Sequence, residues 1–297
     1  MEGWLHAPMR GVPMAAVSLL RVKAKLLFAS RRLKFATAIC FAAITVVFLQ
    51  GLSRFWAHDT GELPSAAVGW MGNYESMHTY LWVFCVLLIM PILACSLYGD
   101  VLLQDTQTAR LPALVSRTSP DAYIVSSALL VFLSSFLFVL LFELVSQLMA
   151  FFVFPVQADV DSFQIGYLSN AAEMETRMSY LSRLPFGPLA GMNPYLFNAA
   201  YMLYDAFYMG VMALLSFAIS LFVRRGSLLV LAFPTALLLL SSQVLPVPIN
   251  PTSSLLISVS HAEGQTLLLT LLAPVCLLVL CVGAILVHQY IVRGDYI

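Results

Sequence analysis

Six long apolar stretches constrain the fold of this chain more than any other feature of its sequence. A bilayer core of about 30 Å takes roughly 20 apolar residues to cross, and lipid forces them into helices because it cannot bond the backbone polar groups. The stretches lie at residues 35–52, 79–98, 122–154, 196–223, 227–246 and 266–292. We therefore expect an all-α, polytopic integral membrane protein with six transmembrane helices. The third stretch is too long for one perpendicular crossing, so we expect it to tilt, protrude or bend before Pro155.

The composition agrees with lipid as the solvent. Hydrophobic residues make up 61% of the chain and charged residues only 10%, whereas a soluble domain carries roughly a quarter charged residues. The formal net charge of zero argues against nucleic acid as a partner. The five cysteines lie in apolar runs without CxxC spacing, which is typical of small core residues rather than of disulfides or metal ligands.

The distribution of basic residues predicts the orientation. Cytoplasmic loops of membrane proteins carry an excess of lysine and arginine. If the N-terminus is inside, every lysine and arginine faces the cytoplasm except Arg54, Arg177 and Arg183. Trp56, Trp82 and the aromatic residues between them would then form a belt at the outer interface. Both termini are therefore expected in the cytoplasm.

The domain organisation predicted from these patterns is simple. Residues 1–34 form a basic, cytoplasmic N-terminal segment, and residues 35–297 form a single six-helix transmembrane domain with a cytoplasmic loop at 99–121 and an outer segment at 157–195. Within the outer segment, residues 169–182 have the pattern of one short helix.

An amphipathic helix is expected at residues 13–32 of the N-terminal segment, lying on the inner leaflet. Its basic side serves either to set the topology or to dock to a specific partner, and the sequence leaves both open. The apolar face consists of Ala15, Leu19, Val22, Leu26 and Ala29, and the basic face of Arg21, Lys25 and Arg32.

Motifs for two kinds of chemistry are missing. A phosphate-binding loop requires Gly-Lys before Ser or Thr, and none of the lysines follows a glycine. The sequence contains no HExxH, and its histidines are scattered. We therefore expect no catalytic residue, metal site or cofactor in this chain.

Two acids interrupt the apolar stretches, and intramembrane acids are functional candidates because burying charge in lipid is costly. Glu143 and Asp205 should reach a similar, outer depth, with Tyr201, Tyr204 and Tyr208 on the Asp205 side at helical spacing. One interpretation is a substrate path or a proton relay. The other is that the acids reach water at the outer interface, with the tyrosines in the aromatic belt.

The Tyr204-Asp205 pair also resembles the first aspartate motif of intramembrane aspartyl proteases. That family has a second motif, GxGD, within a span. The Gly-Asp pairs of this chain, Gly99-Asp100 and Gly294-Asp295, lie at helix ends and lack the earlier glycine. Without a second facing aspartate there is no proton-sharing dyad, so this alternative is the weakest.

The loop after the second span carries the most informative resemblance. It begins at Tyr98-Gly99-Asp100, continues through Asp105 and Arg110, and reads LPALVSR up to Arg117. This loop resembles that of type-2 ABC transporter permeases, in which a short cytoplasmic helix with acidic residues and a Leu-Leu-Ser-Arg stretch docks into the ATPase subunit. The departures are Ala109-Arg110 in place of Gly-Thr, Thr118 in place of a proline, and Pro112 inside the expected helix, which we expect to begin near Leu111 so that the proline falls in its first turn. The resemblance assigns coupling to Asp100, Asp105, Arg110, Leu111, Leu114, Val115 and Arg117, with Leu111, Leu114 and Val115 as an apolar knob and Asp105, Arg110 and Arg117 as a charged rim.

The resemblance implies a membrane subunit of an ATP-driven exporter in a bacterial plasma membrane. It would pair with a second permease copy or homologue as a dimer, and separate ABC ATPase subunits would bind ATP and Mg. The outer part of the substrate path, near Glu143 and Asp205, would be mostly apolar, which favours an amphipathic or peptide-like substrate. The alternatives are a proton-coupled secondary transporter that uses Glu143 and Asp205 and, less well supported, an intramembrane protease.

The orientation can be tested with reporter tags. Because the basic residues concentrate on one side, tags at Met1 and Ile297 should both report a cytoplasmic location, and a tag at Ser169 an external one. Termini on opposite sides would mean an odd number of spans and would contradict the predicted fold.

Overall fold

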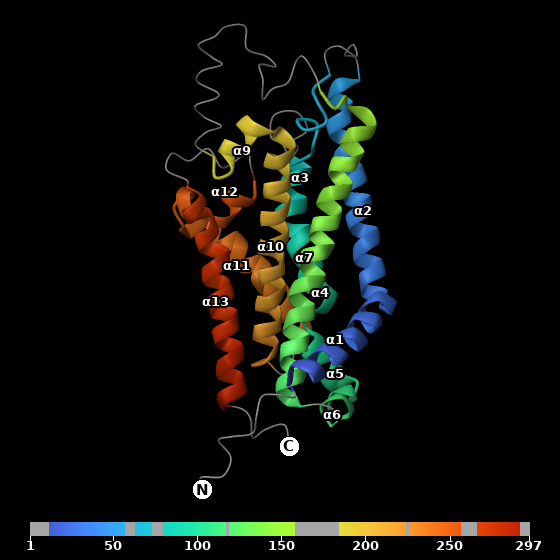
Figure 1. Ribbon diagram of the computed structural model, residues 1–297, viewed down its shortest axis with the longest axis vertical. Helices are drawn as coiled ribbons and strands as arrows, with labels where there is room; N and C mark the ends of the chain where they lie inside the picture. The colour runs from blue at the N-terminus through green and yellow to red at the C-terminus, as the bar shows by residue number, and fades with distance from the viewer. Residues whose placement is uncertain are drawn as a thin grey trace.

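The computed structural model describes residues 12–56, 63–72, 80–116, 119–157, 184–223, 226–256 and 266–291 (Figure 1). All regular secondary structure in these ranges is helical. Six helical segments are long and apolar enough to cross a membrane, which confirms the helical fold and fits a multi-pass membrane protein. They are α2 (Arg31–Leu52), α3 to α4 (Tyr80–Tyr98), α7 (Pro120–Val153), α10 (Pro194–Ser220), α11 (Ser227–Val244) and α13 (Leu267–Ile291). Both termini and the 169–182 helix lie outside the described residues.

The N-terminal region contains a break that the sequence analysis did not predict. Helix α1 (Val12–Ala29) ends before Ser30, and α2 begins at Arg31 rather than at residue 35. Ser30 is extended (φ −70°, ψ 143°), and its hydroxyl accepts a hydrogen bond of 3.2 Å from the Leu33 N–H, so it is the N-cap of α2. The helix expected over 13–32 is therefore present but ends three residues early, and Arg31 and Arg32 belong to α2. Figure 1 shows α1 turning away from α2.

The second span contains a wide turn. Its first part, α3 (Tyr80–Phe84), leads into a π-helical segment, η4 (Cys85–Ile89), and then into α4 (Met90–Tyr98). Pro91 has no N–H to donate to the carbonyl four residues earlier, which is a common reason for a helix to widen at such a point. The span is thus two helices joined through an irregular turn.

Helices α7 and α10 form the centre of the bundle. Helix α7 is unbroken over 34 residues, or about 51 Å at 1.5 Å per residue, so it keeps helical geometry up to Val153 instead of bending. It packs along α10 in the most extensive helix pair of the fold, and α10 is the most buried span. Figure 1 shows this pair in the middle, with α2 and α13 on opposite flanks.

Short helices lie at both ends of the bundle (Figure 1). Helix α5 (Val101–Gln107), α6 (Arg110–Val115) and α1 lie at one end, which we call the loop end. Helix α9 (Gly187–Met192), the 3₁₀ turn η5 (Val247–Ile249) and α12 (Pro251–Leu255) lie at the other. Another 3₁₀ turn, η2 (Ser53–Phe55), ends the first span.

A non-helical segment, residues 63–72, fills the end opposite the loop end; we call it the plug. The side chains of this segment are buried with at most 1% exposure at Ser65, Ala66, Ala67, Val68 and Trp70, although no regular structure satisfies their backbone. Non-helical backbone is tolerated at such a place only when the protein itself supplies the hydrogen bonds. The sequence analysis treated these residues as part of an outer loop and missed their burial.

Two side-chain amides each satisfy one carbonyl group of the plug. Gln147 of α7 donates to the Ala66 carbonyl at 2.7 Å, and Asn198 of α10 donates to the Ala67 carbonyl at 2.9 Å. Asn198 also donates to Gln147 Oε1 at 2.8 Å, which links the two helices beneath the plug. The plug is thus fixed by the central helix pair.

Indole and ring contacts complete this attachment. Trp70 Nε1 donates to Ser146 Oγ at 2.7 Å, and the Phe154 ring lies directly against the Gly69 backbone. A Cβ atom at Gly69 would lie 2.4 Å from that ring, whose other neighbours include Phe55 at a centroid distance of 5.4 Å. Only glycine fits there without displacing Phe154.

We expect Gly69→Ala to lower the thermal midpoint in detergent, because the added methyl group forces the Phe154 ring to move, at a cost of about 1–3 kcal/mol. Gly191→Ala is the matched control, since a Cβ there meets nothing within 4 Å. Equal midpoints for the two variants would show that the plug does not pack as described.

Candidate functional site

The loop between the second and third spans forms two short helices at the loop end. A turn at Thr108 and Ala109 separates α5 from α6, and Ala109 adopts a left-handed backbone with φ 54°. This conformation costs a residue with a side chain roughly 1–2 kcal/mol, and glycine adopts it freely. Glycine at position 109 would therefore relieve the backbone strain of this turn. Helix α6 begins at Arg110, one residue before the expected start, and Pro112 lies in its first turn, as expected.

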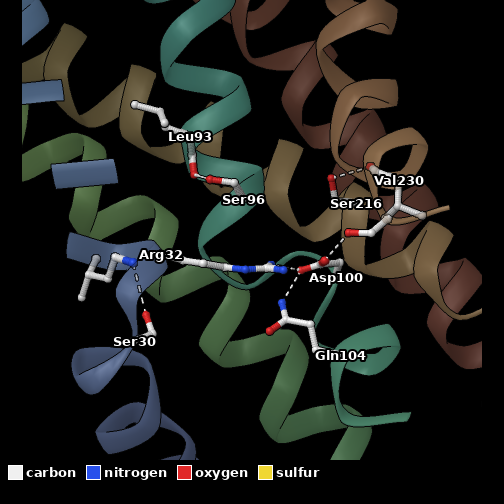
Figure 2. Close-up of polar contacts among 10 residues, drawn as sticks. Ser30, Arg32, Leu93, Ser96, Asp100, Gln104, Ser216 and Val230 are labelled. Atoms are coloured by element: carbon white, nitrogen blue, oxygen red, sulfur yellow. Dashed lines mark hydrogen bonds and ion pairs between the residues drawn. The ribbon is translucent and has the colours of Figure 1, made fainter. Parts of the chain in front are cut away.

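Asp100 fastens this loop to two spans. Its side chain is fully buried. Oδ1 accepts hydrogen bonds from Arg32 Nη1 of α2 at 2.7 Å and from Gln104 Nε2 of α5, and Oδ2 accepts one from Ser227 Oγ at the start of α11. Figure 2 shows Arg32 and Gln104 pointing toward Asp100 from different elements. Asp100 is therefore an internal anchor of the loop and not a residue of its surface.

Asp105 is the second internal anchor. Its carboxylate is 8% exposed and accepts a hydrogen bond of 2.6 Å from the Tyr123 hydroxyl of α7. The expectation that Asp105 belongs to a charged rim is wrong, because the helical register of α5 turns this acid toward α7. Of the other expected rim residues, Arg110 is exposed and Arg117 lies outside the described residues.

The apolar residues of α6 face partly inward. Leu111, Leu114 and Val115 are half-buried and pack against the apolar cluster at the loop ends of α7 and α10, so they do not form a free knob. The exposed side of α6 is formed by Arg110, Pro112 and Ala113. On the opposite side, a small apolar pocket lies behind α6 and is lined by Leu102, Leu111, Val115, Pro120, Tyr123, Ile124 and Leu221.

The two intramembrane acids are buried in the bundle, one on each helix of the central pair. Glu143 of α7 is fully buried and Asp205 of α10 is 4% exposed, and their carboxyl groups are close enough to interact electrostatically. Neither oxygen of Glu143 has a hydrogen-bond partner within the described part of the chain, and the same holds for Oδ1 of Asp205. The interpretation that these acids reach water is therefore wrong, because both side chains are buried inside the bundle.

The tyrosines next to Asp205 are also internal. Tyr201, Tyr204 and Tyr208 are all buried, and the Tyr204 hydroxyl donates to the Thr270 carbonyl of α13 at 3.1 Å. They do not form an exposed aromatic belt.

A polar column connects the plug with the carboxyl pair. Gln147 lies one helical turn beyond Glu143, and Asn198 lies about two turns before Asp205. The amide pair that holds the plug is therefore stacked along the same helices as the carboxyl pair. Sequence reasoning missed Gln147 and Asn198, although the spacing of four residues between Glu143 and Gln147 was a signal that both occupy one face.

Comparison with known proteins gives no match: no protein-family model, curated protein or solved structure matches this chain. In the described ranges, no group of three histidine, cysteine or acidic side chains is arranged to hold a metal ion. The site is thus defined by its own geometry, which consists of an anchored loop at one end and a carboxyl pair beneath a plug toward the other.

We expect Glu143→Leu to leave the thermal midpoint unchanged or to raise it, because it removes a buried carboxyl group whose oxygens lack hydrogen bonds. Gln147→Leu, one turn away, should lower the midpoint, since it breaks the bonds to Ala66 and Asn198 at a cost of about 1–3 kcal/mol. A strong destabilisation by Glu143→Leu would mean that this carboxyl group has partners essential to the fold.

Proposed function

We propose that this chain is the permease subunit of an ATP-driven exporter of the type-2 ABC kind. One observation carries the proposal: the α5–α6 loop is fastened to three spans through buried acids. Asp100 ties it to α2 and α11, and Asp105 ties it to α7. A push on α6 by a partner would therefore be transmitted to all three spans instead of bending a loose loop.

The proposal also needs a surface on which a partner can push. The exposed side of α6, with Arg110 and Ala113, is the surface that the anchored loop presents. Rim charges such as Arg110 mainly tune encounter and register, whereas close packing at the centre of a contact carries most of the binding energy. Ala113 is small and central in α6, so it would allow close approach of an ATPase pocket.

The remaining parts fit a cycle of outward transport. In this proposal the loop end is cytoplasmic, separate ATPase subunits bind ATP and Mg there, and the plug closes the outer end. Six spans enclose little space of their own, so a second permease copy or homologue would form the other wall of the path. The bacterial plasma membrane and an amphipathic or peptide-like substrate complete the proposal, on the basis of the family resemblance.

A second candidate is a proton-coupled transporter, and the carboxyl pair favours it. Glu143 and Asp205 are buried together without a described cationic side chain bonded to either, which is the kind of site that takes up a proton. The intramembrane protease gains no such support. The acid whose charge acts on Asp205 is a glutamate, Glu143, while Asp100 is bonded to Arg32 at the loop end.

The test is a charge placed on the exposed side of α6. We expect Ala113→Asp to fold but to lose co-purification of the ATPase and substrate-stimulated ATP hydrolysis in proteoliposomes, because it buries an unpaired carboxylate in the contact. Ala113→Ser, which adds no charge, should still co-purify with the ATPase and should keep substrate-stimulated ATP hydrolysis. The inward-facing Leu114 is a poorer target, since Leu114→Asp would also disturb packing.

Two results would contradict the exporter proposal. The first is ATP hydrolysis by this chain alone, with contaminants excluded, because it has no phosphate-binding loop. The second is normal coupling in Ala113→Asp, which would show that α6 is not the contact.

A further inference from the structure

Helix α1 carries a fully buried lysine. Lys23 has no exposed surface, although its neighbours Arg21, Val22 and Lys25 are all exposed. Its Nζ lies 3.3 Å from the centroid of the Tyr123 ring and donates hydrogen bonds to the Tyr123 carbonyl at 3.4 Å and to Ser127 Oγ. A buried lysine is rare unless it is paired, so its surroundings indicate a specific role.

Lys23 lies in the middle of the face by which α1 packs on α7. Leu19 and Leu27, four residues to either side, are the other buried residues of this face, with 5% and 4% exposure. This face differs from the predicted apolar face, because Val22 and Leu26 are exposed. Two leucines alone would satisfy an apolar contact, so the lysine between them contributes polar contacts that apolar packing does not require.

Tyr123 connects this lysine to the loop. The Tyr123 ring lies under the Lys23 ammonium group, and its hydroxyl donates to Asp105 of α5. Lys23, Tyr123 and Asp105 therefore form one buried chain of contacts that joins α1, α7 and α5. We infer that Lys23 is a positioning residue that latches α1 onto α7 and thereby fixes the α5–α6 loop in the position from which it couples to the ATPase.

The latch has a chemical consequence that packing alone would not have. Burial lowers the pKa of the Lys23 ammonium group from its ordinary 10.5 to about 7, and the charge of Asp105 partly opposes this shift. When α1 is released into water, Lys23 regains its ordinary pKa. Docked α1 therefore binds fewer protons than released α1 between about pH 7 and 10.5. Docking strengthens as the pH rises through that window, by at most about tenfold per pH unit, and is weakest and constant below it.

Other titratable groups surround the chain of contacts. The charge of Asp105 of α5 acts on Lys23, and the charges of Asp105 and of Arg110 of α6 both act on Tyr98 of α4. Asp121 lies in the first turn of α7, two residues before Tyr123. A transition between pH 6.5 and 8.5 that Lys23→Met abolishes is therefore the one that belongs to Lys23.

The first measurement follows α1 directly and needs no ATPase. Leu27→Cys, in a Cys276→Ser background that removes the exposed native thiol, reports release of α1 through its reaction with N-ethylmaleimide. Val22→Cys, exposed on the same helix, corrects for the intrinsic pH dependence of the thiol reaction. The quantity compared is the labelling rate of Leu27→Cys divided by that of Val22→Cys, both measured in proteoliposomes.

We expect this ratio to rise as the pH falls from 8.5 to 7 and to level off below about 6.5. Lys23→Met keeps the length of the side chain but can neither be protonated nor donate to Tyr123 and Ser127, so its ratio should be independent of pH and, at pH 8.5, higher than that of the unmodified chain. Lys25→Met removes an exposed charge from the same helix and should behave like the unmodified chain. Asp105→Asn should extend the rise to lower pH, because the carboxylate no longer supports the ammonium group. A ratio independent of pH in the unmodified chain, or the same pH dependence in Lys23→Met, would overturn the latch.

The second measurement addresses positioning and rests on the proposed function. In Lys25→Met, ATPase stimulation should fall as the pH is lowered from 8.5 to 6.5, because α1 docking weakens over the same interval. In Lys23→Met, stimulation should not show this pH dependence. If both variants show the same pH profile, Lys23 does not position the loop. If no variant recruits an ATPase, the exporter proposal fails, and the labelling experiment still decides whether Lys23 latches α1.

Discussion

The contact between α7 and α10 is the interaction on which the rest of the structure depends. Lipid offers no hydrogen bonds, so polar groups in the bundle need partners within the protein, and this helix pair supplies many of them. Ser135 of α7 donates to the Ala94 carbonyl of α4 at 2.8 Å, and Ser216 of α10 donates to the Val230 carbonyl of α11 at 3.0 Å. The plug, α1 and α13 are held in the same way by side chains of these two helices. The flanking spans are therefore arranged around a polar seam and not only around an apolar core.

The six spans were predictable because length and apolarity are properties of the sequence alone. Their ends were less so. The apolar stretch begins at residue 35, but α2 extends back to Arg31 because Ser30 caps it and Arg32 finds Asp100. The plug was not predictable for a related reason. A short segment that reads LPSAAVGWMG looks like a loop until its carbonyl partners, Gln147 and Asn198, are known to lie beside it.

The candidate site shows where sequence reasoning stops. It singled out Glu143 and Asp205 because they interrupt apolar spans, and Asp100 and Asp105 because of the family resemblance, and all four are buried in the structure. It could not give their directions, because the rotation of a helix about its axis is set by packing against neighbours that are distant in sequence. Lys23 shows the same limit, since in the sequence it is one basic residue among several that set the topology.

The π-helical turn at Cys85–Ile89 gives the second span an extra residue within its turns. If that residue were reabsorbed into an ordinary α-helical turn, the part below it would shift by about 1.5 Å and rotate by about 100°. The part on the loop side of this turn is α4, which leads directly into Asp100 and the loop. The part on the other side is α3, which lies toward the plug end. The second span is therefore not a rigid rod. A small sliding movement of α4 along the helix axis would be coupled to a rotation of its side chains, while α3 keeps its orientation.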